Sequence, residues 1–258
     1  MAALSGGADA PVEPPLPAAP WTLHGEAIVG LKIVRSDIAQ RFVPPDVKVV
    51  RICPGRTLAF LYLAHYQHSP VGEYRELIVA PALVSRHGRV GFWISNIYVD
   101  SGTSMAAGRA IWALPKQIAS LEWSAGGVSS VGPQLRVSAS VAGTGRSIRL
   151  PFVGAAMSQC GSAKSWFAVR GSARVGHARA SVEFARDDGL AALGFGSTTK
   201  VFVCKKMRVT IGRPRHSVSD LSRSALATMI ETTGRLCALR ISTKPSLRDA
   251  RSRAFDAT

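Results

Sequence analysis

One lysine stands within an apolar stretch of a strongly charged chain. It is Lys116, which ends the segment Gly108-Arg109-Ala110-Ile111-Trp112-Ala113-Leu114-Pro115-Lys116. Apolar surroundings favour the neutral amine over the ammonium ion, and a neutral amine is a nucleophile toward carbonyl groups. Pro115 disfavours helix at Leu114, so we expect Lys116 to lie on a rigid bend after a short Ala-rich helical turn. The alternative is a lysine whose stem covers apolar surface while its ammonium group reaches water.

A carboxylate is the second candidate for chemistry. The alternation in Glu73 to Ala80 predicts a strand whose residue 76 shares a face with apolar side chains. A carboxylate in such a place is either paired with a cation or held protonated, and both forms can exchange protons with an amine. The alternative is an edge-strand glutamate that pairs at the surface with Arg75 or Arg86. The expected faces are Tyr74, Glu76, Ile78 and Ala80 against Glu73, Arg75, Leu77 and Val79.

The next strand is expected from Val90 to Val99, after a turn at His87-Gly88. Its alternation sets Phe92, Ile94, Asn96 and Tyr98 against Trp93, Ser95, Ile97 and Val99. Both faces are apolar with one small polar residue, and one of them should line the same cavity as Glu76. The candidate substrate contacts are therefore taken from both faces and from the neighbouring strand: Phe92, Ile97, Tyr98 and Tyr74.

These segments together resemble the acetoacetate decarboxylase family. The resemblance covers about Trp21 to Pro214 and rests on Gly72-Glu73-Tyr74-Arg75-Glu76, Ile97-Tyr98-Val99-Asp100, Gly108-Arg109 and Leu114-Pro115-Lys116. It implies a mainly β fold, an antiparallel cone-like barrel with short helices that encloses the pocket and often forms homo-oligomers. It also implies a Schiff-base lysine at Lys116 with Glu76 as its proton-transfer partner, acting on a small keto acid without a metal or other cofactor.

The chain departs from the family pattern at several pocket positions. Gln117 stands where the family has a second lysine, and Ala110 where a glutamate follows Gly-Arg. An arginine expected near Glu26 or Ala27 and a glutamate expected near Leu61 are also absent. Activation of the lysine amine should therefore depend more on burial than on a neighbouring cation.

Arg109 has two possible roles. It could bind a substrate carboxylate bidentately, or it could fix the bend before Lys116. Arg75 is the other candidate for the carboxylate, although a regular strand would point it away from Glu76. The first functional hypothesis is a decarboxylating lyase. The alternatives are imine chemistry without decarboxylation, of an aldolase or dehydratase type, and a carbonyl-binding protein without turnover.

Composition places limits on other functions. The 258 residues are 47% hydrophobic, enough for a sizeable core. The four cysteines are far apart and form no C-x-x-C pair, which favours a reducing, cytoplasmic location over a zinc or disulfide framework. His65 and His68 would face opposite ways on a strand, so we expect no metal site there. No serine-hydrolase or nucleotide-binding motif is complete.

Charge and residue type divide the chain into three expected parts. Residues 1–20 form an Ala/Pro-rich flexible leader, without the pattern of a targeting peptide or of a membrane span. Residues 21–214 form the acetoacetate decarboxylase-like domain, whose last expected β runs are Trp166 to Arg170, Ala180 to Phe184 and Lys200 to Ile211. Residues 215–258 form a basic extension, helical over Ser217 to Gly234 and then disordered. The net charge is +16, and Lys205 to Thr258 carry 12 basic and 4 acidic residues, so a polyanion partner such as nucleic acid is a third hypothesis, one that rests on charge alone.

Overall fold

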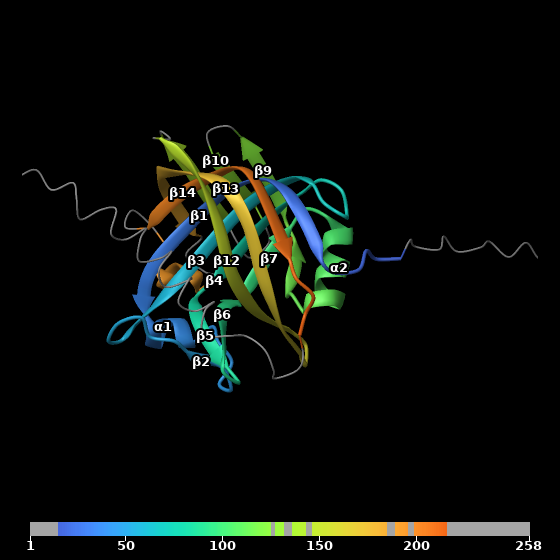
Figure 1. Ribbon diagram of the computed structural model, residues 1–258. Coiled ribbons are helices and arrows are strands. Elements are labelled where there is room, and N and C mark those ends of the chain that lie inside the picture. Colours follow the sequence, from blue (N-terminus) through green and yellow to red (C-terminus); the bar gives the residue numbers. More distant parts are fainter. Residues whose placement is uncertain are drawn as a thin grey trace, which may run out of the picture.

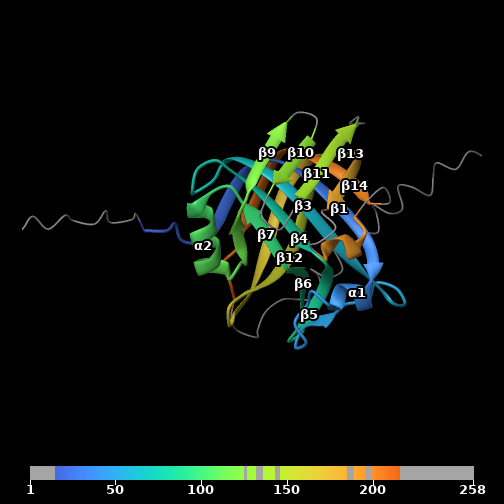
Figure 2. The same cartoon turned by 180° about the vertical axis from the view of Figure 1, so that it is seen from behind.

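The computed structural model describes residues 15–124, 127–131, 136–142, 146–184, 189–195 and 199–215. In these ranges the chain is mainly β, with strands curved around a common interior and the two α-helices on opposite sides (Figure 1; Figure 2). The predicted helix over Ser217 to Gly234 and the rest of the basic extension lie outside the described residues, as does most of the leader. No helix of the described part combines the length and the apolar character that crossing a bilayer requires.

Within the described ranges, two short helices and one 3-10 turn interrupt a succession of strands. The helices are α1 (Ser36–Gln40) and α2 (Gly102–Trp112), and the 3-10 turn is η1 (Leu190–Leu193). The strands are β1 (Trp21–Arg35), β2 (Lys48–Val49), β3 (Arg56–His68), β4 (Tyr74–Ala80), β5 (Ala82–Arg86), β6 (Arg89–Ile94), β7 (Asn96–Val99), β8 (Lys116–Ile118), β9 (Ser120–Ser124), β10 (Gly127–Val131), β11 (Arg136–Ala142), β12 (Ser147–Cys160), β13 (Ala163–Phe184) and β14 (Lys200–Ile211).

The strands form one sheet that returns on itself. Its main path runs β2-β5-β6-β12-β13-β14-β1-β3-β4-β7-β8, and the pairs are antiparallel except β12 with β6 and β7 with β8. β6 and β7 are separated by Ser95 alone, yet β6 pairs with β12 while β7 pairs with β4. Residues 89–99 therefore link the two ends of the path β12-β13-β14-β1-β3-β4. The predicted β-rich fold is confirmed, and the sheet encloses an interior space.

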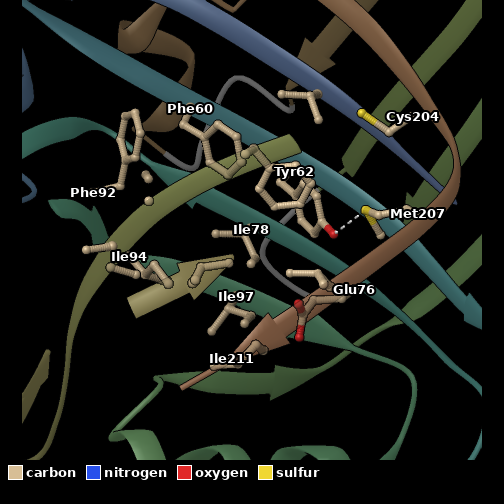
Figure 3. Close-up of a pocket in the computed structure, with 18 of the residues that line it drawn as sticks. Phe60, Tyr62, Glu76, Ile78, Phe92, Ile94, Ile97, Cys204, Met207 and Ile211 are labelled. Carbon is tan, nitrogen blue, oxygen red and sulfur yellow. Dashed lines mark hydrogen bonds between the residues drawn. The ribbon is translucent and has the colours of Figure 1, made fainter. Parts of the chain in front are cut away.

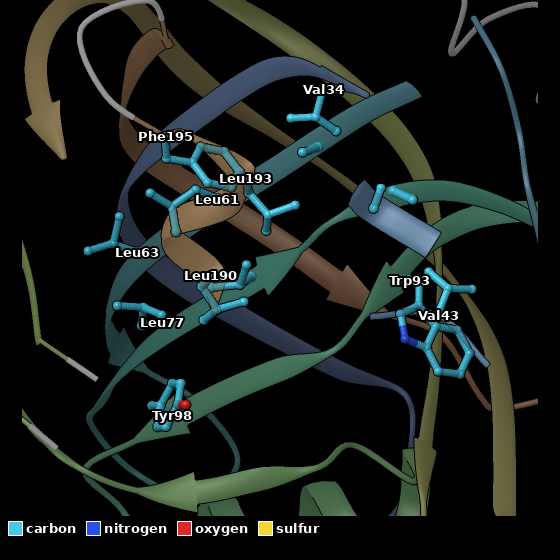
Figure 4. Packing of buried hydrophobic residues seen from close by; sticks show 14 of the residues in the cluster. Val34, Val43, Leu61, Leu63, Leu77, Trp93, Tyr98, Leu190, Leu193 and Phe195 are labelled. Carbon is cyan, nitrogen blue, oxygen red and sulfur yellow. The ribbon is translucent and has the colours of Figure 1, made fainter. Parts of the chain in front are cut away.

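Both faces of the central strands are buried, as the two-sided apolar pattern of Thr57 to Tyr66 predicts. On one face, residues such as Leu61, Leu63 and Leu77 pack with η1 in an outer core (Figure 4). On the other face, alternate residues of the same strands turn toward the interior space. Each central strand thus stabilises the fold with one face and builds a cavity with the other.

Two strand predictions needed correction. The single strand expected from Val90 to Val99 is two strands, because the break at Ser95 shifts the side-chain alternation by one residue. The separate runs expected at Trp166 to Arg170 and Ala180 to Phe184 belong to β13, one strand of 22 residues. The strand β5 was not expected at all.

Candidate active site

Lys116 is placed by the end of helix α2. Ser101 caps the start of the helix through its Oγ, which accepts from the Ser104 amide at 3.2 Å. The helix stops at Ala113, which adopts a left-handed conformation with φ 50° and ψ 36°. Pro115 then directs the chain into β8, where Lys116 lies opposite Ile97 of β7. The predicted bend is present, and it turns the lysine side chain inward.

The amine of Lys116 is buried and fully engaged. Lys116 is 2% exposed, and its Nζ lies 2.9 Å from Glu76 Oε2 and 2.8 Å from Ser104 Oγ. The Tyr74 ring lies beside it, with 5.2 Å from Nζ to the ring centroid. Glu76 is itself 4% exposed. The two titratable candidates therefore form one buried pair. The alternatives, a lysine whose ammonium group reaches water and a glutamate paired at the surface, do not agree with the structure.

Gly108 makes room for this lysine. A Cβ at residue 108 would lie 2.6 Å from Lys116 Cδ and Cε and 3.3 Å from Nζ. The distances of 2.6 Å are shorter than any contact between carbon atoms, so a side chain at residue 108 would force the stem of Lys116 to move. The absence of a side chain at Gly108 thus allows Lys116 to pack directly on the helix.

A row of phenols lies next to the carboxylate. Tyr66 donates its hydroxyl hydrogen to Glu76 Oε1 at 3.3 Å, and its oxygen lies 3.0 Å from that of Tyr62. Tyr62 in turn donates to Met207 Sδ at 3.4 Å, as the dashed line in Figure 3 marks. Burial raises the pKa of Tyr62, Tyr66 and Tyr74 above that of an ordinary phenol. These hydroxyls stay protonated and are available as hydrogen-bond donors.

The pair lies in a cavity of about 310 Å³ with a mainly apolar wall. Among the described lining residues, Glu76 and Lys116 are the two that carry charge. Figure 3 shows apolar side chains from several strands around the cavity, with Ile78 and Ile97 nearer the Glu76 carboxylate and Phe60 and Phe92 farther from it. Such a wall excludes water and strengthens every electrostatic interaction inside it.

The strand faces predicted for β4 are confirmed, since Tyr74, Glu76, Ile78 and Ala80 all line the cavity. The proposed contacts Phe92 and Ile97 also line it, although alternation alone put them on opposite faces. The break at Ser95 explains this, because it brings Ile97 to the side of Phe92 and sends Tyr98 to the outer core (Figure 4). The prediction of Tyr98 as a pocket residue is therefore wrong.

Arg109 also lies outside the cavity lining. Its side chain is exposed, and Nε donates to the Lys116 carbonyl oxygen at 2.8 Å. Of the two roles considered, this geometry agrees with the one that fixes the bend, and a substrate-binding role inside the cavity does not fit. Arg75 is unsuitable as well, because it pairs with Asp100 at 2.9 Å on the opposite face of β4.

Sequence reasoning missed three polar neighbours of the pair. Tyr66 could have been found from the hairpin of β3 and β4, whose register places it opposite Tyr74. Tyr62 follows on the same face of β3, four residues earlier. Ser104 gave no local signal, because its contact with Lys116 depends on how the helix packs against β8.

No group of three His, Cys, Asp or Glu side chains in the described ranges is arranged to hold a metal ion. His65 instead pairs with Glu73, at 2.7 Å from Nε2 to Oε1. The site is thus built from an amine, a carboxylate, hydroxyl groups and apolar side chains.

Comparison with known proteins places this site in a family. The family described as Acetoacetate decarboxylase (ADC) matches residues 9–150, more than half of the chain and the part that holds Glu76 and Lys116. The chain belongs to the acetoacetate decarboxylase family. The resemblance drawn from the motifs is thereby confirmed.

The chain is also similar to curated plant proteins. Over 100 residues the chain is 34% identical to Protein NEOXANTHIN-DEFICIENT 1 of Solanum lycopersicum, covering 39% of this chain and 34% of that protein. The protein of the same name from Arabidopsis thaliana is 31% identical over 100 residues, covering 39% and 35%. The chain thus matches about a third of the length of these relatives.

Solved structures agree on the fold. The enduracididine biosynthesis enzyme MppR complexed with pyruvate superposes with a TM-score of 0.54 at 16% identity, over 80% of this chain and 93% of that one. Acetoacetate decarboxylase from Legionella pneumophila superposes with a TM-score of 0.53 at 15% identity, over 83% and 97%. At these identities the similarity establishes a shared architecture.

Proposed function

We propose that this chain is an enzyme that forms an imine between Lys116 and a carbonyl compound, with Glu76 as the proton carrier. The observation that carries the proposal is the distance of 2.9 Å between Nζ and Glu76 Oε2 inside a mainly apolar cavity. Membership of the acetoacetate decarboxylase family supports an enzymatic role. The separate roles of Lys116 and Glu76 belong to the proposal.

The reaction would begin with a proton transfer within the pair. Glu76 takes a proton from the ammonium group, and the neutral Nζ attacks the carbonyl carbon to give a carbinolamine. Glu76 returns the proton to the hydroxyl group, which leaves as water, and the C–N bond becomes an iminium. Ser104 Oγ, 2.8 Å from Nζ, would hold the amine in the direction of attack.

The first candidate reaction is decarboxylation of a keto acid. In a β-keto acid the bond between the α-carbon and the carboxylate breaks, its electron pair moves toward the iminium to give an enamine, and CO2 leaves. Glu76, which takes a new proton from solvent water, donates it to the α-carbon, and water then hydrolyses the resulting iminium to release the ketone and the free amine. An apolar wall favours this step, because a carboxylate is poorly solvated there while CO2 is neutral.

The second candidate is imine chemistry that keeps the carboxylate or needs none. Two observations favour it. The described cavity wall offers no guanidinium to hold a carboxylate, since Arg109 and Arg75 are engaged elsewhere. A structure of MppR, which shares this architecture, holds the condensation product of pyruvate and imidazole 4-carboxaldehyde. Binding of a carbonyl ligand without turnover is the limiting form of this candidate.

Two measurements on one set of samples would test the proposal. Wild-type protein is incubated with a panel of β-keto and α-keto acids, and CO2 release is followed while borohydride-reduced adducts are detected by intact mass. We expect an adduct of one ligand per chain and its loss in Lys116→Gln. Adduct with CO2 supports decarboxylation, and adduct without CO2 supports the second candidate. Equal turnover in Lys116→Gln would refute the proposal.

Assembly and location belong to the same proposal. Family members commonly form homo-oligomers, and we propose the same for this chain in the cytoplasm. Light scattering after size-exclusion chromatography tests the assembly, and a monomer at micromolar concentration would contradict it.

A further inference from the structure

The cavity is polar at one end and apolar along the rest of its length. The strand register places Tyr66 opposite Tyr74 and Phe60 opposite Ala80, so the pairs mark successive levels along β3 and β4. Glu76 lies at the level of residue 64, six residues from Leu58, which also lines the cavity. At about 3.3 Å per residue, this corresponds to roughly 20 Å of wall. Beyond the phenol of Tyr62, the lining side chains on this wall are hydrocarbon.

Apart from Tyr62, the partly exposed residues of the cavity lining are apolar as well. Lys116, Glu76, Tyr66 and Tyr74 are buried, whereas the partly exposed members of the wall include Leu31, Phe60, Phe92 and Phe152. Val153, also in the lining, is 50% exposed. A ligand that enters from solvent therefore passes hydrocarbon before it meets the amine.

The sheet leaves a gap where this apolar wall meets solvent. β12 pairs with β6 over Ala156, Met157 and Ser158, and residues 147–155 have no partner on that edge among the described strands. Residues 150–156 of this edge line the cavity without a break, from Leu150 to Ala156. A strand whose consecutive residues all border one cavity lies at its rim. The unpaired edge of β12 thus borders the cavity and is exposed to solvent at Pro151 and Val153.

The size of the cavity sets the length of ligand that it can enclose. Its volume of about 310 Å³ corresponds to roughly ten groups of the size of water or methylene, at about 30 Å³ each. A charged carboxylate against this wall would lose its hydration without gaining a cationic partner other than Lys116. A hydrocarbon chain in the same place binds more favourably with every methylene group that leaves water.

From these observations we propose that the ligand of this site is an aldehyde or ketone with an apolar chain of about eight to twelve carbons, whose volume matches the cavity. The carbonyl carbon reaches Nζ of Lys116, and the chain extends past Ile78, Phe60 and Phe92 to the β12 edge. The inference rests on the proposed imine chemistry and deepens it by naming the substrate class. The covalent step is the one given above, in which the amine and the carbonyl form an iminium and release one water.

A series of straight-chain methyl ketones tests this ligand class. The full chain is incubated with ketones from four to twelve carbons, the iminium is reduced with cyanoborohydride, and the half-saturating concentration is read from the adduct mass. We expect this concentration to fall about fourfold with each added methylene, until the chain fills the cavity near ten carbons. Beyond that length the fall should level off.

A matched pair of variants locates the chain. Leu31 lines the cavity and Ile33, two residues along the same strand, is 49% exposed and does not. Leu31→Trp should raise the half-saturating concentration of long ketones at least tenfold and leave that of butanone unchanged, whereas Ile33→Trp should behave as wild type. Thermal unfolding confirms that both variants are folded.

The outcomes separate the two proposals. If adducts form equally well at every chain length, the ligand class is wrong and the imine chemistry stands. If no ketone of any length is trapped on Lys116 and no keto acid is either, the proposed function fails first. The wild-type series decides between these outcomes even if a variant does not fold.

Discussion

Replacing Gly108 by alanine should disable the site while leaving the fold intact. The new Cβ would lie 2.6 Å from Cδ and Cε of Lys116. Carbon atoms in contact are about 3.5–4.0 Å apart, so the lysine stem must move by about 1 Å. A shift of that size separates Nζ from Glu76 and Ser104, which it meets at 2.9 and 2.8 Å. Misplacement by about 1 Å can cost roughly 100-fold in rate, which is the loss we expect in imine formation.

The effect on stability should be much smaller than the effect on the amine. Overpacking in a core costs about 1–3 kcal/mol, and alanine in place of glycine within a helix returns about 1 kcal/mol. The expected loss in the free energy of unfolding is therefore up to about 2 kcal/mol. Urea unfolding measures this loss. The rate of adduct formation in the presence of cyanoborohydride measures how far the displacement of the amine slows its reaction with a carbonyl.

The same helix supplies the control. A Cβ at Gly102 would meet no heavy atom within 4 Å, so Gly102→Ala adds a methyl group without touching the lysine. This variant should form the adduct at the wild-type rate. If Gly108→Ala forms adduct as fast as Gly102→Ala, the packing argument is wrong and Lys116 does not need the space at residue 108.

Three further predictions concern the pair, the bend and the thiol. Glu76→Gln and Lys116→Met should each lower the free energy of unfolding by about 3–5 kcal/mol, because each leaves a buried charge without its partner. In urea unfolding the double variant should lose clearly less than the sum of the two single losses, and additive losses would contradict a coupled pair. Arg109→Met should slow adduct formation about tenfold, because it removes the hydrogen bond to the Lys116 carbonyl oxygen that holds the bend, worth roughly 1.4 kcal/mol. The half-saturating ketone concentration should not change, since no cavity contact is lost. A changed half-saturating concentration would indicate that Arg109 contacts the ligand. Burial raises the pKa of Cys204 to about 11, from the usual value of 9.0, so the folded state keeps a proton that the unfolded thiol has lost. The free energy of unfolding should therefore fall as pH rises from about 9 toward 11, and Cys204→Ala should flatten that fall; an unchanged slope would assign it to other groups, such as the buried tyrosines.

The sequence allowed the pair itself to be predicted because both residues carry a local signal. Alternation along β4 is undisturbed, so the face of Glu76 could be read directly from its apolar neighbours. For Lys116, the apolar segment before Pro115 indicated burial, and the proline indicated the bend. The two side chains meet because β7 pairs with both β4 and β8. The motif resemblance implied that Lys116 and Glu76 share a pocket, but neither it nor periodicity predicted this pairing.

Errors arose where long-range pairing overrides local pattern. No glycine or proline stands next to Ser95 to mark the break there. The strand breaks because the residues before Ser95 pair with β12 and those after it pair with β4. Tyr98 was consequently assigned to the wrong side. The expected run from Trp166 ended at Arg170, just before Gly171, but this glycine lies within β13, where a Cβ would collide with the Arg208 carbonyl oxygen of β14. A close approach of backbones has the same sequence signal as a turn.

The role of Arg109 shows a different limit. The sequence gives the residue and its distance from the lysine, but both proposed roles need the same guanidinium group. The choice depends on where the side chain points, and that is set by the left-handed turn at Ala113, which brings the Lys116 carbonyl within 2.8 Å of Nε. Residue type alone does not contain this information.

The central claim is that one buried amine among the eight lysines of this chain is the reactive one. The most direct test is peptide mapping of the protein after reduction with cyanoborohydride in the presence of 2-decanone, with the adduct quantified at every lysine. The account predicts modification at Lys116 far above that of exposed residues such as Lys205. Modification that follows solvent exposure, with Lys116 left unmodified, would contradict it.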